Sequence, residues 1–149
     1  MHQPFFNFSR NVRDFILKNK DQIKFYNSIH AFGQMILLPY GYSCEIAPGY
    51  EKLEYFANKA NEALYAVHGS KYDVGCIPCL LYIVSGGSKD WAFGVAGIPY
   101  SYGMELRPNA PWPHGFILPT DEIIPTGEET WAFHQTAARM IIDEFTNPL

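Results

Sequence analysis

The chain has 149 residues, of which 48% are hydrophobic and 17% charged, so we expect one folded domain and exclude extensive disorder. Fifteen acidic residues against 11 basic ones give a net charge of −4, without the basic stripe typical of nucleic-acid binding. No segment approaches the roughly 20 apolar residues of a membrane span, and the first residues do not resemble a secretory signal peptide. The sequence therefore predicts neither a nucleic-acid nor a membrane partner.

Helical and extended patterns alternate along the chain, which predicts a layered α/β domain. Apolar residues at helical spacing predict helices over residues 9–20, 49–69, 90–96 and 126–147. Alternating or continuous apolar runs predict extended segments over residues 23–30, 34–38, 77–84 and 100–106. The last helix is the clearest. It follows a T-x-x-E capping box, Thr126 to Glu129, and shows apolar spacing at Trp131, His134, Ala138, Ile141, Ile142 and Phe145.

The three cysteines comprise an isolated Cys44 and the C-x-x-C pair Cys76 and Cys79. A four-cysteine zinc site needs a second such pair, which the sequence lacks. A redox motif would precede a helix, whereas strand is expected on both sides of this pair. We therefore favour one disulfide and one free thiol, which would indicate an oxidising compartment.

Two polar residues stand out from apolar surroundings. His30 ends a predicted strand, and Glu105 lies inside another, where a carboxylate is unusual. In the simplest interpretation His30 bonds to backbone and Glu105 pairs with Arg107 on a solvated face. The sequence contains no H-E-x-x-H metal motif, no G-x-S-x-G nucleophile elbow and no phosphate-binding P-loop, so these two residues have no local motif to explain them.

Longer segments add a second pattern. They run from Ser28-Ile29-His30 to Gly41-Tyr42, from Tyr82 through Ser85-Gly86-Gly87-Ser88-Lys89 to Trp91, over residues 97–102, over Glu105-Leu106-Arg107, and over residues 115–119 and 124–131. In order and spacing they resemble zinc metallocarboxypeptidases of the carboxypeptidase A/B type. The resemblance extends over nearly the whole chain, residues 1–149, and corresponds to the C-terminal half of that family's catalytic domain. It implies a layered α/β/α fold with a mixed central sheet, here incomplete.

The resemblance also implies roles for individual residues. His30 matches a zinc ligand, and Glu105 matches the general base that deprotonates the attacking water. Tyr82 matches a tyrosine on a mobile loop that closes over the substrate. Ala31 and Phe32 match positions beside the zinc histidine that contact the peptide backbone. The implied activity is release of the C-terminal residue of peptides or proteins with Zn²⁺ as cofactor, in a secreted enzyme.

Lys89 occupies the position that resembles the family's specificity residue, at the bottom of the pocket for the C-terminal side chain. A buried ammonium there would favour an acidic C-terminal residue. Alternatively, Lys89 lies on the surface, pointing away and paired with Asp90. The resemblance further suggests a disulfide from Cys44 to Cys76 or Cys79.

One part of the family's zinc site has no counterpart in the sequence. The other two zinc ligands belong to an H-x-x-E motif, and none of the five histidines here has a glutamate three residues later. A single imidazole does not hold a catalytic zinc, so we expect this chain alone to be incomplete and inactive. The sheet would also keep an unpaired edge and an uncovered apolar face. The alternative function is therefore a non-catalytic fragment that binds another protein.

Overall fold

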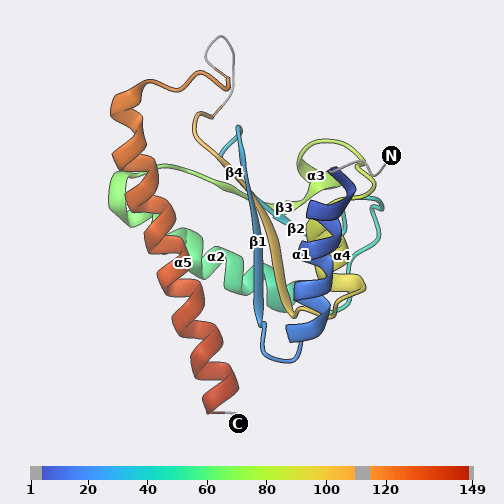
Figure 1. The fold of residues 1–149 in the computed structure, drawn as a ribbon. Helices are drawn as coiled ribbons and strands as arrows, with labels where there is room; N and C mark the ends of the chain where they lie inside the picture. Colours follow the sequence, from blue (N-terminus) through green and yellow to red (C-terminus); the bar gives the residue numbers. More distant parts are fainter. Residues whose placement is uncertain (1–4, 110–114, 148–149) are drawn as a thin grey trace.

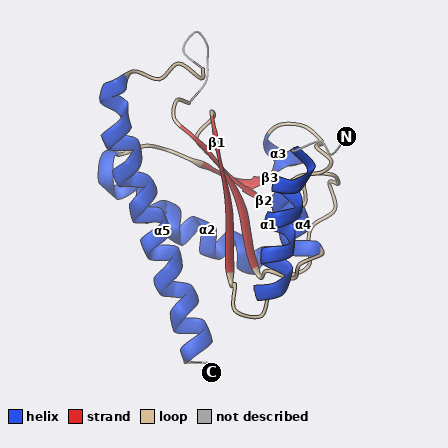
Figure 2. Cartoon of the chain, in the orientation of Figure 1, coloured by secondary structure: helices blue, strands red, loops and turns tan. Residues whose placement is uncertain are grey.

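A computed structural model of the chain describes residues 5–109 and 115–147. Its elements form three layers, with a twisted sheet between two groups of helices (Figures 1 and 2). The layered α/β/α expectation is thus confirmed. The helices are α1 (Phe5–Asn19), α2 (Tyr50–His68), α3 (Ile77–Leu80), α4 (Ser88–Gly94) and α5 (Ile123–Thr146), with a short 3₁₀ turn at Thr120–Glu122. The strands are β1 (Phe25–Ala31), β2 (Met35–Leu38), β3 (Asp73–Cys76) and β4 (Tyr100–Leu106).

The four strands form one mixed sheet in the order β1-β4-β2-β3. β1 runs parallel to β4, β4 antiparallel to β2, and β2 parallel to β3. Sequence neighbours β1 and β2 are therefore separated by β4, which inserts between them. β4 is the most buried strand, and its first five residues are buried. Consequently β4 provides a rigid support for Glu105 near its end.

Each face of the sheet has its own hydrophobic core. α2 and α5 cover one face, and α1 and α4 cover the other (Figure 1). The larger core lies under α2 and α5 and includes Ile36, Leu38, Leu53, Leu64, Tyr100, Tyr102, Met104, Phe133 and Ile141. The smaller one, under α1 and α4, comprises Ile16, Ala92, Ala96 and Ile98. Among the described helices, none is both long and apolar enough to cross a membrane.

The expectation of an extended segment over residues 77–84 is wrong in its first half. The structure has a strand just before it, β3, followed by the helical turn α3 from Ile77 to Leu80. β3 ends where its partner β2 ends, because Leu38 pairs with Cys76 and no further β2 residue remains to pair. Pro78 then favours a helical turn, since its fixed φ suits the first positions of a helix.

The last helix starts at Ile123, not at the predicted capping box. Pro125 fits in the first helical turn, so the chain passes directly from the 3₁₀ turn into α5. The predicted apolar spacing exists, but most of it faces outward: Trp131 is 67% exposed and Ile142 58%. The buried residues of the helix are instead Thr126, Glu129, Phe133, Ala137 and Ile141.

Candidate active site

His30 and Glu105 lie side by side on neighbouring strands. In the parallel pairing of β1 with β4, the Cα atoms of His30 and Glu105 are direct partners. Because residues paired in this way send their side chains to the same face, the imidazole and the carboxylate face the same side of the sheet. The imidazole is exposed, and its Nε2 lies 2.7 Å from the Ser28 hydroxyl. The structure therefore brings together the two residues that the sequence singled out.

The Glu105 carboxylate is poorly solvated. Burial raises the pKa of Glu105 above its ordinary value, and the nearby His30 opposes that shift. Its Oε2 atom is buried and has no hydrogen-bond partner among the described residues. The predicted pairing with Arg107 is wrong, because Arg107 instead binds Glu129 and Glu122. Glu105 thus keeps a free oxygen and a raised proton affinity, which suits a group that accepts a proton.

The turn after β1 positions the two residues that follow His30. Ala31 ends the strand opposite Leu106 and is exposed, while Phe32 packs edge-to-face on Phe116 with ring centroids 5.1 Å apart. The Gly33 amide donates to the Leu106 carbonyl at 3.0 Å, which closes the turn. Gly33 has φ +152°, a backbone conformation that residues other than glycine rarely adopt, so the turn favours glycine.

Lys89 is buried, so the alternative in which it lies on the surface is wrong. Its residue is 4% exposed, and its Nζ lies 2.5 Å from Asp90 Oδ1, which confirms the pairing with Asp90. The second Asp90 oxygen accepts the Gly41 amide at 2.8 Å. Burial lowers the pKa of Lys89, against the effect of Asp90. Asp90 therefore orients the lysine inside the protein, whereas the sequence analysis placed this pair on the surface.

The lysine stem lies close to the candidate catalytic pair. A Cβ at Gly103 would lie 3.5 Å from Lys89 Cδ, so the lysine stem packs directly against Gly103. Gly103 precedes Glu105 by two residues on β4 and therefore faces the same side of the sheet. This places Lys89 beneath the same face as Glu105 and His30.

Tyr82 lies in the segment that follows α3. It is 68% exposed, and the segment is held by a hydrogen bond from the Val84 amide to the Gly41 carbonyl, 2.8 Å long. Beyond it, Gly86 has φ +79°, a conformation that favours glycine. A groove of about 750 Å³ begins at Gly86 and Gly87 and runs between α1 and α4. The structure thus shows Tyr82 exposed on a short segment between α3 and α4.

A buried ion pair anchors the end of β4. Arg107 binds both carboxylate oxygens of Glu129, through Nε at 2.9 Å and Nη2 at 2.6 Å, and also contacts Glu122. Ser70 accepts a hydrogen bond from Arg107, and the Tyr72 hydroxyl donates one to Glu129 at 2.9 Å. Glu129 is fully buried, at 0% exposure. In the sequence, Glu129 lies four residues before Phe133, which indicates that both side chains lie on the same, buried face of the helix.

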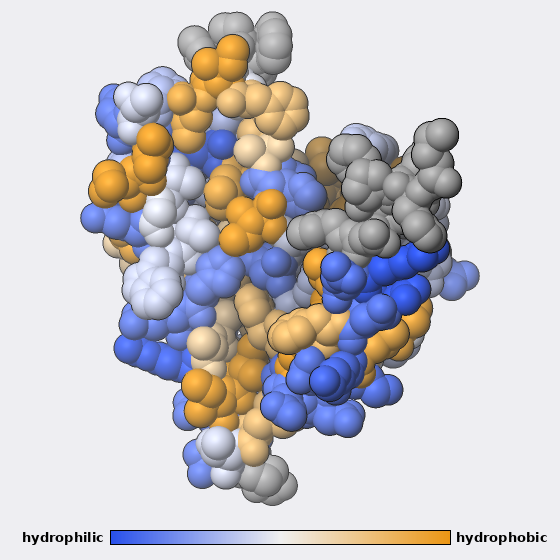
Figure 3. All heavy atoms as spheres, viewed as in Figure 1, coloured by the Kyte–Doolittle hydropathy of each residue, from blue (hydrophilic) through white to orange (hydrophobic). Residues whose placement is uncertain are grey.

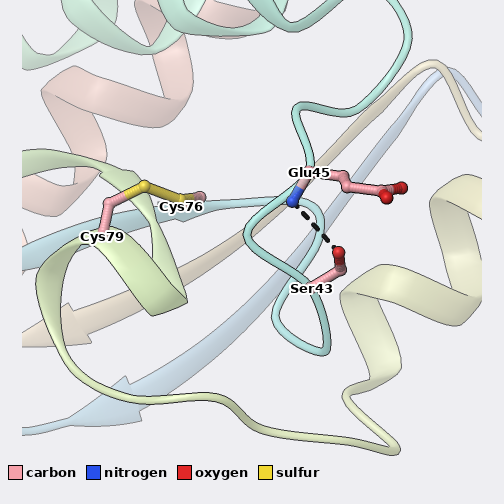
Figure 4. Close-up of a disulfide and its surroundings, with 4 residues drawn as sticks. All are labelled: Ser43, Glu45, Cys76 and Cys79. Carbon is pink, nitrogen blue, oxygen red and sulfur yellow. Dashed lines mark hydrogen bonds between the residues drawn. A yellow bond between two sulfur atoms is a disulfide. The ribbon is translucent and has the colours of Figure 1, made fainter.

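The disulfide joins Cys76 to Cys79, across the end of β3 and the start of α3 (Figure 4). Cys44 is free and exposed. One disulfide and one thiol were expected, but the pairing of Cys44 with Cys76 or Cys79 is wrong. The helical turn α3 explains the observed pairing, because it folds the chain so that the two Cα atoms are 5.2 Å apart, within the range that a disulfide spans.

Thiol labelling without a reductant is expected to modify Cys44 alone, and labelling after reduction to modify all three cysteines. The physical reason is that the exposed Cys44 thiol is free while the other two sulfurs are bonded to each other. Peptide mass spectrometry identifies the labelled residue. Label on Cys76 or Cys79 with Cys44 protected would instead support the pairing that the structure does not show.

His30 lacks the companions that a zinc site needs. Across residues 5–109 and 115–147, no three His, Cys, Asp or Glu side chains gather in a way that could hold a metal ion. A catalytic zinc requires three protein ligands and one open position. The described residues therefore fit a part of such a site, one imidazole with an adjacent base, but not the whole site.

Comparisons with known proteins agree with this arrangement. A family model described as "Zinc carboxypeptidase" matches residues 7–133. The chain is 39% identical to carboxypeptidase B of Astacus astacus over 137 residues, which is 92% of this chain and 45% of that protein. It is 40% identical to carboxypeptidase A2 of Rattus norvegicus, covering 90% of this chain and 31% of that protein.

Solved structures show the same partial coverage. The structure of bovine thrombin-activatable fibrinolysis inhibitor in complex with tick carboxypeptidase inhibitor aligns with a TM-score of 0.85 at 34% identity. That alignment covers 91% of this chain and 45% of the solved chain. Carboxypeptidase A from Helicoverpa armigera aligns with a TM-score of 0.78 at 33% identity. That alignment covers 87% of this chain and 32% of the solved chain. This chain thus spans less than half the length of the relatives it matches.

Proposed function

Because the chain belongs to the zinc carboxypeptidase family, we propose that residues 1–149 form the C-terminal part of a catalytic domain that releases the last amino acid of peptides or proteins. The observation that carries this proposal is the pairing of His30 with Glu105 on one face of the sheet. A parallel strand pair holds the two side chains at a fixed separation, as a site for water activation requires.

Glu105 is the proposed general base. Its buried, unpartnered oxygen would accept a proton from the attacking water and would then donate that proton to the leaving amine. The raised pKa of Glu105 supports this role, because a base that must also return the proton works best with a pKa closer to neutrality. A bound zinc ion, by its Lewis acidity, makes the same water more acidic.

His30 would supply one zinc ligand, and the described residues do not supply the other two. Ser28, 2.7 Å from Nε2 of His30, is placed to orient the ring. The remaining ligands would come from the portion of the domain that the relatives have and this chain does not match. The Cys76–Cys79 disulfide supports an extracellular location, because disulfides persist in oxidising compartments.

Three further residues would contact the substrate. Ala31 and Phe32 directly follow His30, so peptide backbone that reaches the metal would pass beside them. Tyr82, exposed on its short segment, would close over the bound peptide. Phe32 offers the substrate an apolar ring without a hydroxyl group. This ring packs against Phe116.

Lys89 supports a preference for acidic C-terminal residues. Both oxygens of Asp90 already have partners, Lys89 and the Gly41 amide, whereas the ammonium has further donors to offer. A substrate carboxylate would satisfy them, while an apolar side chain would leave them unpaired in a buried site.

The preference is tested in a single chain that joins residues 1–149 to the unmatched part of Astacus astacus carboxypeptidase B. We expect faster release of C-terminal Glu than of Phe, and a loss of roughly 10- to 100-fold in the Glu/Phe ratio of kcat/KM for Lys89→Met. Lys59→Met, which changes an exposed lysine on α2, serves as the matched control and should leave the ratio unchanged. Faster Phe release by the unmodified protein would disprove the acidic preference.

The second candidate function is a non-catalytic module that binds another protein. The incomplete metal-ligand set of the described residues favours it. Metal analysis and a peptidase assay on the purified 149-residue chain, with and without the complementary part of the domain, separate the two. Activity that appears only when the domain is completed supports the enzyme. Tight association without any hydrolysis supports the binding module.

A further inference from the structure

The start of α1 contains a sequence that fits an acceptor for N-linked glycosylation. Such an acceptor consists of asparagine, any residue except proline, and then serine or threonine. The segment Asn7-Phe8-Ser9 meets this requirement. None of the other asparagines in the sequence has serine or threonine two positions later. The motif is therefore a single candidate modification site, and the proposed peptidase chemistry does not use it.

Helical geometry places Asn7 on the side of α1 that faces away from the core. Among residues 9–19 of this helix only Ile16 is buried, at 6% exposure, and it packs in the smaller core with residues of α4. Ile16 follows Asn7 by nine residues. Nine residues make about two and a half turns of an α-helix, a rotation of about 180°. The two positions therefore lie on opposite faces of α1.

The residues that share this outer face are solvated. Asn11, Asp14 and Lys18 follow Asn7 at helical spacing, and all three are exposed, the Asp14 side chain at 61%. Ser9, the third residue of the motif, is exposed as well. Figure 3 shows hydrophilic side chains gathered over α1. A bulky, hydrated group attached to this face would therefore leave the packing of the helix against the core unchanged.

The cysteines indicate a compartment in which such an acceptor is used. N-linked glycans occur on proteins that enter the secretory pathway, whose compartments are oxidising. The disulfide between Cys76 and Cys79 fits the same environment, because disulfides persist where thiols are not kept reduced. The inference drawn below rests on the proposed function only through the extracellular location proposed with it.

We infer that Asn7 carries an N-linked glycan on the outer face of α1. The donor is an oligosaccharide linked to a lipid through pyrophosphate. The side-chain nitrogen of Asn7 forms a bond to the first sugar carbon, the bond from that carbon to the pyrophosphate oxygen breaks, and the lipid pyrophosphate leaves. The amide gives up one proton, and no atom is oxidised or reduced, so the transfer needs no further reactant.

The test is secretion from insect cells, behind an added signal peptide, of the 149-residue chain and of the single chain that joins it to the unmatched part of Astacus astacus carboxypeptidase B. Both should carry a glycan on Asn7. Peptide mass spectrometry after enzymatic deglycosylation in heavy-oxygen water marks the asparagine that carried it. An endoglycosidase should also trim the glycan from the folded joined chain without denaturant, because Asn7 lies on the outer face of α1. An unmodified Asn7 in either secreted protein would overturn the inference.

Matched variants assign the glycan to the motif. Asn7→Gln and Ser9→Ala should each lose the glycan completely, because the acceptor needs both residues. Ser9→Thr should keep it, since threonine also completes the motif, and so should Asn11→Gln, at an exposed asparagine outside the motif. A glycan that persists in Asn7→Gln would lie on another residue and overturn the inference. A joined chain that is glycosylated on Asn7 but hydrolyses no peptide would contradict the proposed function and still support this inference.

Discussion

Replacement of Arg107 by methionine is expected to lower the free energy of unfolding by about 3–5 kcal/mol. The change removes the guanidinium and leaves the Glu129 carboxylate, which has no solvent exposure, without its cation. Hydrogen bonds from Arg107, Ser70 and Tyr72 hold the pKa of Glu129 below its ordinary value of 4.5, although burial alone would raise it. The Arg107–Glu129 pair therefore stabilises the fold at pH values above the ordinary glutamate pKa of 4.5. This contribution is lost as the pH falls through the lower pKa of Glu129 in the folded protein.

Urea unfolding at pH 7 measures the effect. Arg13→Met provides the matched control, because Arg13 pairs with Asp14 at side chains that are 50% and 61% exposed. An exposed pair of this kind contributes about 0–1 kcal/mol. The double variant R107M/E129L should recover much of the lost stability, since it leaves no unpaired charge. Equal losses for R107M and R13M would show that the buried pair is unimportant.

Glu105→Gln should lower kcat by roughly 10²- to 10⁴-fold in a chain that completes the catalytic domain. Glutamine keeps the size of the side chain but does not accept the proton of water. Stability should be unchanged or slightly higher, because the substitution replaces a desolvated carboxylate whose Oε2 has no hydrogen-bond partner in the described residues. Steady-state kinetics and thermal unfolding together separate a chemical effect from a structural one.

Glu62→Gln supplies the control, since Glu62 lies on the exposed surface of α2 and pairs with Lys59. Its activity should stay within about twofold of the unmodified protein, the range typical of surface substitutions. Retention of most activity in E105Q would assign the base to another residue.

The sequence predicts most elements of the fold because their apolar periodicity is strong. The strand at Tyr100–Leu106 has the predicted bounds, and α2 differs from its predicted range by one residue at each end. The sequence does not predict α3, because the apolar run from Ile77 to Leu80 is compatible with a strand or a helix. Pairing between β2 and β3 stops where β2 ends, so the length of β2 decides where β3 stops. Local patterns do not contain that information.

The candidate site could also be predicted from the sequence only in part. A histidine at a strand end and a glutamate inside a strand are visible in the sequence, but their adjacency depends on β4 inserting between β1 and β2. The Arg107–Glu129 pair was missed because the T-x-x-E pattern suggested a helix cap, whereas the 3₁₀ turn before α5 moves the helix start to Ile123. Long-range charge pairing of this kind is decided by tertiary packing.

Gly103 has a consequence for protein engineering. The missing side chain at Gly103 makes room for the Lys89 stem, and a Cβ there would also lie 3.5 Å from Leu37 Cβ. Alanine would fit at ordinary contact distance, but valine or leucine would need space that the Lys89 stem and the Leu37 side chain occupy. Under the specificity role proposed for Lys89, two positions on different elements would therefore be open to redesign: Lys89 for the chemistry of the recognising group, and Gly103 for the depth at which that group lies.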